Sequence, residues 1–73
     1  MSLRNIGKSI RERRKELNVN QRTVADLSGV AVNTLLAVER GEGNPQLSSL
    51  IAILDTLGLQ IEITVKQLND ETV

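Results

Sequence analysis

Three glycines divide the chain into short segments, and their spacing limits what the chain can fold into. Apolar residues recur at helical spacing within these segments, and Gly29, Gly41 and Gly58 each follow the last apolar turn of one of them. Glycine readily adopts the left-handed conformation that ends a helix, so each marks a stop. Together with a further helix end at Asn18, these stops predict four short helices. With 73 residues, they can form only one small domain.

Local signals place the helix boundaries. Asn20 is a suitable N-cap for a helix that starts at Gln21, and the Asn44-Pro45 pair disfavours helix at Asn44 and prepares the next start. Asn18 is predicted to end the first helix. The predicted helices are Ile6 to Leu17, Gln21 to Ser28, Ala31 to Arg40 and Leu47 to Leu57. Their predicted inward residues include Ile6, Ile10, Leu17, Val24, Ala25, Leu27, Leu35, Val38, Leu47, Leu50, Ile51, Ile53, Leu54 and Leu57.

Residues 59–66 alternate apolar and polar side chains without interruption, which predicts a half-buried β-strand. A single strand has no partner within a helical monomer, and an unpaired edge tends to pair with another chain. We therefore expect this strand to pair across a homodimer through Leu59, Ile61, Ile63 and Val65. The predicted layout is a helical domain over residues 1–58, a dimerisation strand over 59–66 and a disordered polar tail over 67–73.

The charges are balanced overall but unevenly distributed. Residues 1–22 carry seven Lys or Arg and two Glu, whereas residues 23–73 carry two cations and seven acids. A chain with this distribution can present one basic face to phosphates despite its zero net charge. A solvated helix of mixed charge explains the same distribution, so charge alone leaves both interpretations open.

Missing residue types argue against catalysis. The chain has no histidine, cysteine or aromatic residue, and so lacks the usual general base, the best nucleophile and the usual metal ligands. Glu12 and Glu16 lie among arginines, which does not suggest a buried acid-base pair. We expect no enzyme activity, cofactor or metal. Without an apolar run of membrane-spanning length or a signal peptide, a cytoplasmic protein is expected.

Two short helices joined by a glycine turn are typical of a helix-turn-helix unit, whose second helix enters the major groove of DNA. Val24 and Ala25 would allow close helix packing, Gly29 would form the turn, and Leu35 and Val38 would anchor the second helix. Any three-helix bundle needs similar apolar positions. Periodicity alone therefore does not establish DNA binding.

Specific motifs give the sequence a family resemblance. They are Ile6 to Arg14, Asn20 to Ala25, Ser28 to Val30, Val38 to Gly41 and Asn44-Pro45. The sequence resembles the Cro/C1-type (Xre-family) helix-turn-helix domain over residues 6–58, and its continuation through Ile63 is more similar to HipB-type antitoxins. The resemblance implies an all-α, lambda-repressor-like four-helix domain. It also implies a homodimer that represses its own operon and has a toxin partner such as a HipA-like kinase.

The same resemblance implies a DNA-contacting surface. It places Gln21 against the DNA backbone or a base edge, and free amides at a helix N-terminus suit a phosphate. Asn33 is the best candidate to read a base, because its amide matches the edge of adenine. Asn44 either contacts a phosphate or only prepares the next helix. The predicted DNA-binding residues are Asn20, Gln21, Arg22, Val32, Asn33, Thr34, Leu36, Ala37, Arg40 and Asn44.

The third helix departs from the family pattern by being apolar. Relatives usually carry Ser or Thr at Ala31, Arg or Lys near Val32 or Ala37, and Ser at Leu36. Apolar side chains can contact the methyl groups of thymine. Alternatively, this face serves a protein partner or has lost strong base specificity, and Leu36 could belong to the core.

The end of the third helix carries a charged pair. The resemblance implies a structural role for Glu39, paired with an arginine of the first helix such as Arg11 or Arg14. Arg40 either shares that structural role or reaches a phosphate.

Together, these features predict a homodimeric repressor that binds double-stranded DNA at a palindromic operator, with recognition helices roughly 34 Å apart. The alternatives are a protein-interaction module that mainly neutralises a toxin and a phage-type repressor without a toxin partner.

Overall fold

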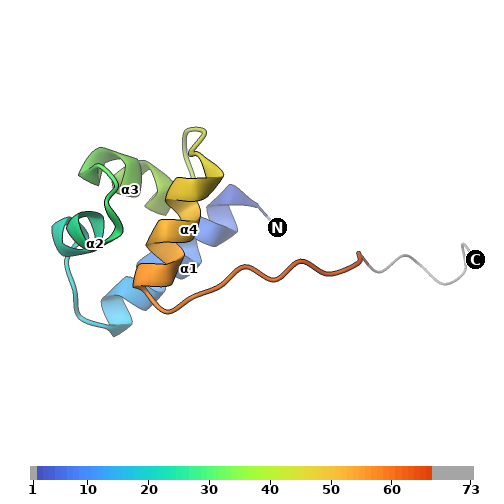
Figure 1. Ribbon diagram of the computed structural model, residues 1–73, viewed down its shortest axis with the longest axis horizontal. Helices are drawn as coiled ribbons and strands as arrows, with labels where there is room; N and C mark the ends of the chain where they lie inside the picture. The colour runs from blue at the N-terminus through green and yellow to red at the C-terminus, as the bar shows by residue number, and fades with distance from the viewer. Residues whose placement is uncertain (1, 67–73) are drawn as a thin grey trace, which may run out of the picture.

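The computed structural model describes residues 2–66, in which four helices form the folded body (Figure 1). They are α1 (Leu3–Glu16), α2 (Gln21–Ser28), α3 (Val32–Glu39) and α4 (Leu47–Thr56). The predicted all-α, lambda-repressor-like class is confirmed. The main boundary difference is that α1 begins three residues earlier than predicted, because Ser2 is an N-cap whose hydroxyl oxygen accepts a hydrogen bond from the Asn5 amide at 3.2 Å.

The predicted caps set the ends of α1 and α2. The side-chain oxygen of Asn20 accepts a hydrogen bond from the Thr23 amide at 2.8 Å, which begins α2 at Gln21. Asn18 after α1 and Gly29 after α2 both have positive φ, at 60° and 76°. The predicted glycine turn between α2 and α3 is thus confirmed.

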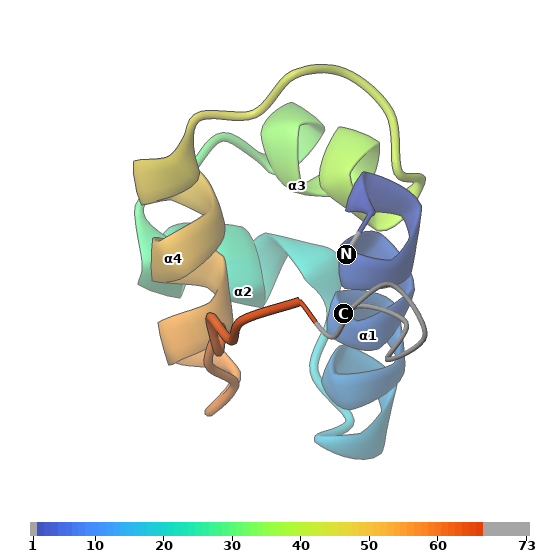
Figure 2. The same ribbon diagram turned by 90° about the vertical axis from the view of Figure 1, so that its right-hand side faces the viewer.

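The helices enclose one small core (Figure 2). Helix α1 packs on α3, and α2 packs on both α3 and α4. The buried apolar residues are Ile10, Val24, Ala25, Leu35, Val38, Leu50, Ile53, Leu54 and Leu57. Every helix contributes to this core, so the orientation of α3 depends on the packing of the whole domain.

Four residues predicted to face inward lie at the surface instead. Leu17 is 43% exposed, Leu27 72%, Leu47 63% and Ile51 44%. Helix α4 packs through the face that carries Ile53 and Leu57 at its centre, so it is rotated relative to the predicted stripe and turns Leu47 and Ile51 outward. Among residues 2–66, no helix covers Leu27 on the short α2.

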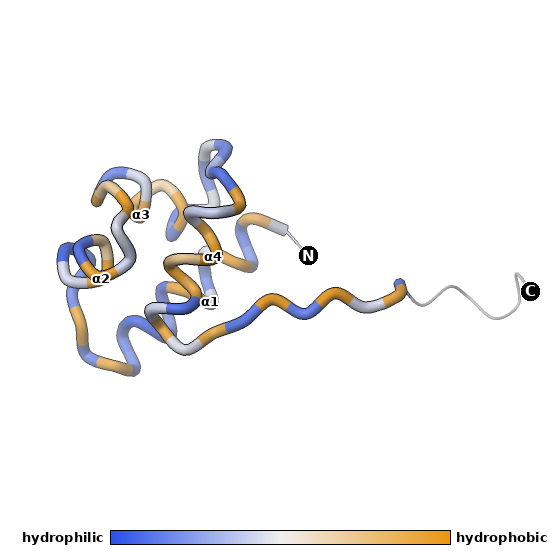
Figure 3. The backbone as a smooth tube through the Cα atoms, viewed as in Figure 1, coloured by the Kyte–Doolittle hydropathy of each residue, from blue (hydrophilic) through white to orange (hydrophobic). Residues whose placement is uncertain are grey.

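Residues 59–66 extend away from the helices and alternate in hydropathy (Figure 3). Leu59 and Ile61 are partly buried against the core, whereas Ile63 and Val65 are 93% and 95% exposed. No strand occurs within residues 2–66. Since the predicted strand requires a second copy, it stays a prediction. The predicted disordered tail, 67–73, lies outside the described residues. No helix in the described part is long and apolar enough to cross a membrane.

Candidate nucleic-acid interface

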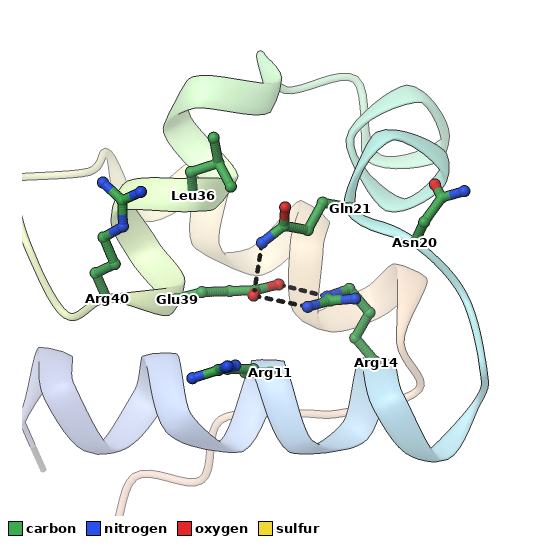
Figure 4. A pocket seen from close by; sticks show the side chains of 7 residues that line it. All are labelled: Arg11, Arg14, Asn20, Gln21, Leu36, Glu39 and Arg40. Carbon is green, nitrogen blue, oxygen red and sulfur yellow. Dashed lines mark hydrogen bonds and ion pairs between the residues drawn. The ribbon is translucent and has the colours of Figure 1, made fainter.

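A charged hollow lies where α1, the start of α2 and the outer side of α3 meet (Figure 4). We call it the arginine hollow, because three of its side chains are arginines. It is lined by Arg11, Arg14, Asn20, Gln21, Leu36, Glu39 and Arg40. With three cations and one carboxylate, its lining is positively charged and complements an anion.

One buried ion pair forms the floor of the arginine hollow. Arg14 binds Glu39 through two hydrogen bonds, from Nε to Oε2 at 2.7 Å and from Nη2 to Oε1 at 3.0 Å. The two side chains are only 11% and 4% exposed. Arg14 also donates to the Val19 carbonyl at 3.0 Å. Of the two predicted arginine partners of Glu39, Arg14 is therefore the one that joins α1 to α3.

The same carboxylate fixes Gln21. The Gln21 side-chain nitrogen Nε2 donates to Glu39 Oε1 at 3.1 Å, so part of its hydrogen-bonding capacity is used inside the protein. Its carbonyl oxygen points away from the ion pair in Figure 4. Gln21 thus presents an acceptor in a defined direction at the first turn of α2. If Gln21 contacts DNA as predicted, its side-chain carbonyl oxygen is the group that makes the contact.

The other predicted residues at the start of α2 are exposed. Asn20 uses its side-chain oxygen to cap the helix, which leaves its amide NH₂ group for an outside acceptor. Arg22 is exposed on the first turn. These two residues and Gln21 surround the amide-rich end of α2, where a phosphate would be stabilised.

The outer face of α3 lies between the arginine hollow and a second hollow. Leu36 and Arg40 line the first. Asn33, Thr34, Ala37 and Asn44 line the second, beside the loop that leads to α4. Eight of the ten predicted DNA-binding residues therefore border these two adjacent hollows, and only Arg22 and Val32 do not.

Two apolar residues of α3 differ in their surroundings. Leu36 is absent from the core cluster and from the apolar residues packed against it, so the alternative that placed it in the core is wrong. Val32 is half-buried and does pack against that cluster. The contribution of Val32 to an outer surface is thus smaller than predicted, because much of its side chain supports the fold.

Arg11 was predicted only as a possible partner of Glu39 and not as a contact residue. Arg14 takes the role of that partner, and Arg11 lines the arginine hollow as an exposed cation. Arg40, on the opposite side, is exposed too. Among residues 2–66, no group of three or more acidic side chains could hold a metal ion.

The geometry agrees with a comparison against known families. The helix-turn-helix family model HTH_3 matches residues 10–63, which include the second half of α1 and all of α2, α3 and α4. The chain belongs to this helix-turn-helix family. The assignment confirms the Cro/C1-type resemblance and makes the protein a DNA-binding transcriptional regulator.

Individual relatives of this HTH_3 protein agree with the assignment. It is 34% identical over 58 residues to the uncharacterised HTH-type transcriptional regulator y4mF of Sinorhizobium fredii, which covers 80% of this chain and 76% of that relative. It is 36% identical over 50 residues to an uncharacterised HTH-type transcriptional regulator of Haemophilus influenzae. That match covers 68% of this chain and 51% of the relative.

A solved structure shows the same fold. The restriction-modification controller protein C.AhdI from Aeromonas hydrophila superimposes with a TM-score of 0.72 at 31% sequence identity. The match covers 80% of this chain and 88% of the controller. The arrangement of the HTH_3 helices is thus shared with a solved member of the controller class.

Proposed function

We propose that this helix-turn-helix protein is a sequence-specific transcriptional repressor that binds a palindromic operator as a homodimer. The observation that carries the proposal is the outer face of α3, which lies between two hollows and beside the exposed cations Arg11 and Arg40. An α-helix fits the major groove, and cations beside it meet the phosphates along the edge of that groove.

Each group has a role in this arrangement. Arg11, Arg40 and the start of α2 bind phosphates and set the position of the protein on the duplex. Asn33 then lies at a base edge, where its amide can pair with adenine. The buried Arg14–Glu39 pair holds α1 and α3 together, which keeps phosphate contacts and base contacts at a fixed separation.

The homodimer is supported by the apolar surface on the opposite side of the domain. Leu47 and Ile51 are exposed on α4, and they line a hollow together with Leu59, Ile61 and Ile63 of the extended segment. Exposed apolar residues in an extended, unpaired segment favour association with another chain. Two copies joined there would present two α3 helices, as a palindrome requires.

Selection from a randomised duplex library, followed by a salt titration, tests the DNA-binding part. We expect one enriched sequence with two inverted half-sites and an affinity that falls steeply with salt concentration. Replacing both Arg11 and Arg40 by Gln should reduce the salt slope by about two and lower affinity for all sequences alike. Lys66→Gln, a cation far along the extended segment, is the matched control. Failure to enrich any sequence above random DNA would overturn the proposal.

A HipB-type antitoxin role is a narrower hypothesis. The relatives named above are transcriptional regulators and a restriction-modification controller, and none is named an antitoxin. A toxin gene that begins within a few bases of this reading frame would favour the antitoxin role. A lone gene would favour the plain repressor.

A further inference from the structure

The outer face of α3 lacks the side chains that read guanine. The helix has the sequence Val-Asn-Thr-Leu-Leu-Ala-Val-Glu, with no arginine or lysine. Guanine is most often recognised by Arg or Lys at its O6 and N7 atoms. On this face, Asn33 and Thr34 are the polar residues, and the next turn presents Leu36 and Ala37.

Leu36 is an apolar side chain in a polar setting. It stands between Gln21 and Arg40 in Figure 4, above the buried ion pair and outside the core. Neither neighbour is apolar, and Arg40 is exposed. Leu36 is half-buried but lies outside the described core cluster, so the exposed part of its side chain is available for an outside contact.

Ala37 provides a second methyl-bearing contact beside Leu36. It lines the other hollow with Asn33, Thr34 and Asn44. Gly43 lies next to Ala37 without crowding it. Even a β-carbon built on Gly43 would lie 3.9 Å from the β-carbon of Ala37. The face of α3 therefore combines one amide, one hydroxyl and two apolar surfaces.

Among the base edges of the major groove, one group pairs with an apolar side chain. This is the C5-methyl group of thymine, whereas all other edge groups are hydrogen-bond donors or acceptors. We propose that Leu36 and Ala37 are specificity-determining residues that select thymine through its C5-methyl group. The inference rests on the proposed DNA-binding function and names the base chemistry that the same surface reads.

The charges around Leu36 favour DNA over a protein as the occupant. Arg40 lies beside Leu36, and Arg11 lies in the same hollow beyond Glu39 (Figure 4), so both cations can meet phosphates while Leu36 faces the groove. Asn33, one turn earlier, suits adenine, so the two contacts together favour adenine and thymine in the half-site.

Replacing thymine by uracil tests the inference, because uracil lacks only the methyl group and pairs normally. The probe is the duplex enriched from the randomised library, resynthesised with uracil at one thymine position at a time. At each contacted thymine we expect affinity to fall about four-fold, since burial of one methyl-sized group corresponds to about 0.8 kcal/mol. 5-Bromouracil, whose bromine is similar in size to a methyl group, should restore the affinity.

Comparing two leucine variants tests whether Leu36 causes the loss of affinity at uracil. In Leu36→Ala the ratio of thymine to uracil affinity should fall toward one at one position of each half-site. Leu27→Ala is the matched control, because Leu27 is a 72% exposed leucine outside both hollows. It should keep the full ratio. Circular dichroism should show that both variants fold.

The outcomes separate this inference from the proposed function. If a sequence is enriched but uracil has no effect at any position, methyl recognition is overturned and the repressor proposal stands. An unchanged thymine preference in Leu36→Ala overturns the role of Leu36. If no sequence is enriched, the repressor proposal fails, and thymine selection by this face fails with it.

Discussion

The two sides of this domain differ in how many of their polar and apolar groups find a partner within one chain. On the side where α1 meets α3, the polar groups of Arg14 and Glu39 are paired and the backbones touch. On the side formed by α4 and residues 59–66, large apolar residues such as Ile63 and Val65 are almost fully exposed. The first side is complete in a monomer, and the second lacks a partner for its apolar surface.

The close approach of α1 and α3 shows the difference most clearly. Gly7 is buried at this crossing, and a β-carbon built on it would overlap the carbonyl oxygen of Val38. A β-carbon built on Gly41, which follows α3, would lie 2.7 Å from the α-carbon of Arg4. The first side is thus rigid, as a surface that positions a recognition helix must be. In the proposed dimer, the second side would meet another copy.

The largest predicted effect on stability comes from adding a side chain where α1 crosses α3. Gly7→Ala should lower the free energy of unfolding by about 3 kcal/mol or more, because the new methyl group meets backbone atoms that cannot rotate away. Thermal denaturation followed by circular dichroism measures it, and the melting temperature should fall by roughly 12 °C or more.

Gly29→Ala is the control for that substitution. No atom lies within 4 Å of a β-carbon at Gly29, but its φ of 76° is left-handed and costs about 1 kcal/mol for alanine. If Gly7→Ala melts no lower than Gly29→Ala, the first side is less tightly packed than we infer.

Breaking the buried ion pair should have the next largest effect. Glu39→Gln leaves Arg14 charged and largely buried, which should cost about 3 kcal/mol of stability. Glu16→Gln removes the same charge from an exposed pair with Arg13, at 3.4 Å, and should cost less than about 0.5 kcal/mol. Urea denaturation compares the two variants. Equal losses would mean that burial does not strengthen the Arg14–Glu39 pair.

Local signals explain why the helices were predictable. Asn20, Gly29 and Gly58 act on their own neighbours, and a cap or stop can be recognised from a few residues. The extra first turn of α1 was missed because its N-cap, Ser2, precedes the apolar stripe that was used to define the helix. The N-cap signal of Ser2 is present in the sequence and predicts this first turn.

Tertiary packing explains the rest. Which arginine binds Glu39 depends on how α1 is rotated against α3, and Arg11 and Arg14 are one turn apart on the same helix. Likewise, the exposure of Leu47 and Ile51 depends on the rotation of α4 against α2. Short helices have apolar residues on more than one face, so their periodicity does not fix that rotation.

A charge on the second side should weaken the proposed dimer. Ile63→Asp should raise the dimer dissociation constant at least ten-fold, about 1.4 kcal/mol, because a carboxylate would enter an apolar contact. The monomer should be unaffected, since Ile63 is 93% exposed in it. Sedimentation equilibrium measures the change.

Thr64→Asp is the matched control, with the same charge on the neighbouring, alternate face of the extended segment. It should leave the dimer intact. If both substitutions act alike, the two faces of residues 59–66 are equivalent, and the alternating pattern does not define the interface.

The smallest predicted effect separates two exposed asparagines on the first side. Asn20→Ala removes the cap of α2 and should cost about 1 kcal/mol of stability. Asn33 makes no side-chain hydrogen bond within residues 2–66, so Asn33→Ala should cost almost no stability.

For DNA-binding specificity the order of the two effects reverses. Asn33→Ala should change the preferred base at one position of each half-site, and Asn20→Ala should weaken all sequences alike. Selection from the randomised library with each variant measures both. An unchanged preference in Asn33→Ala would leave Asn33 without a role, since the fold does not need its side chain.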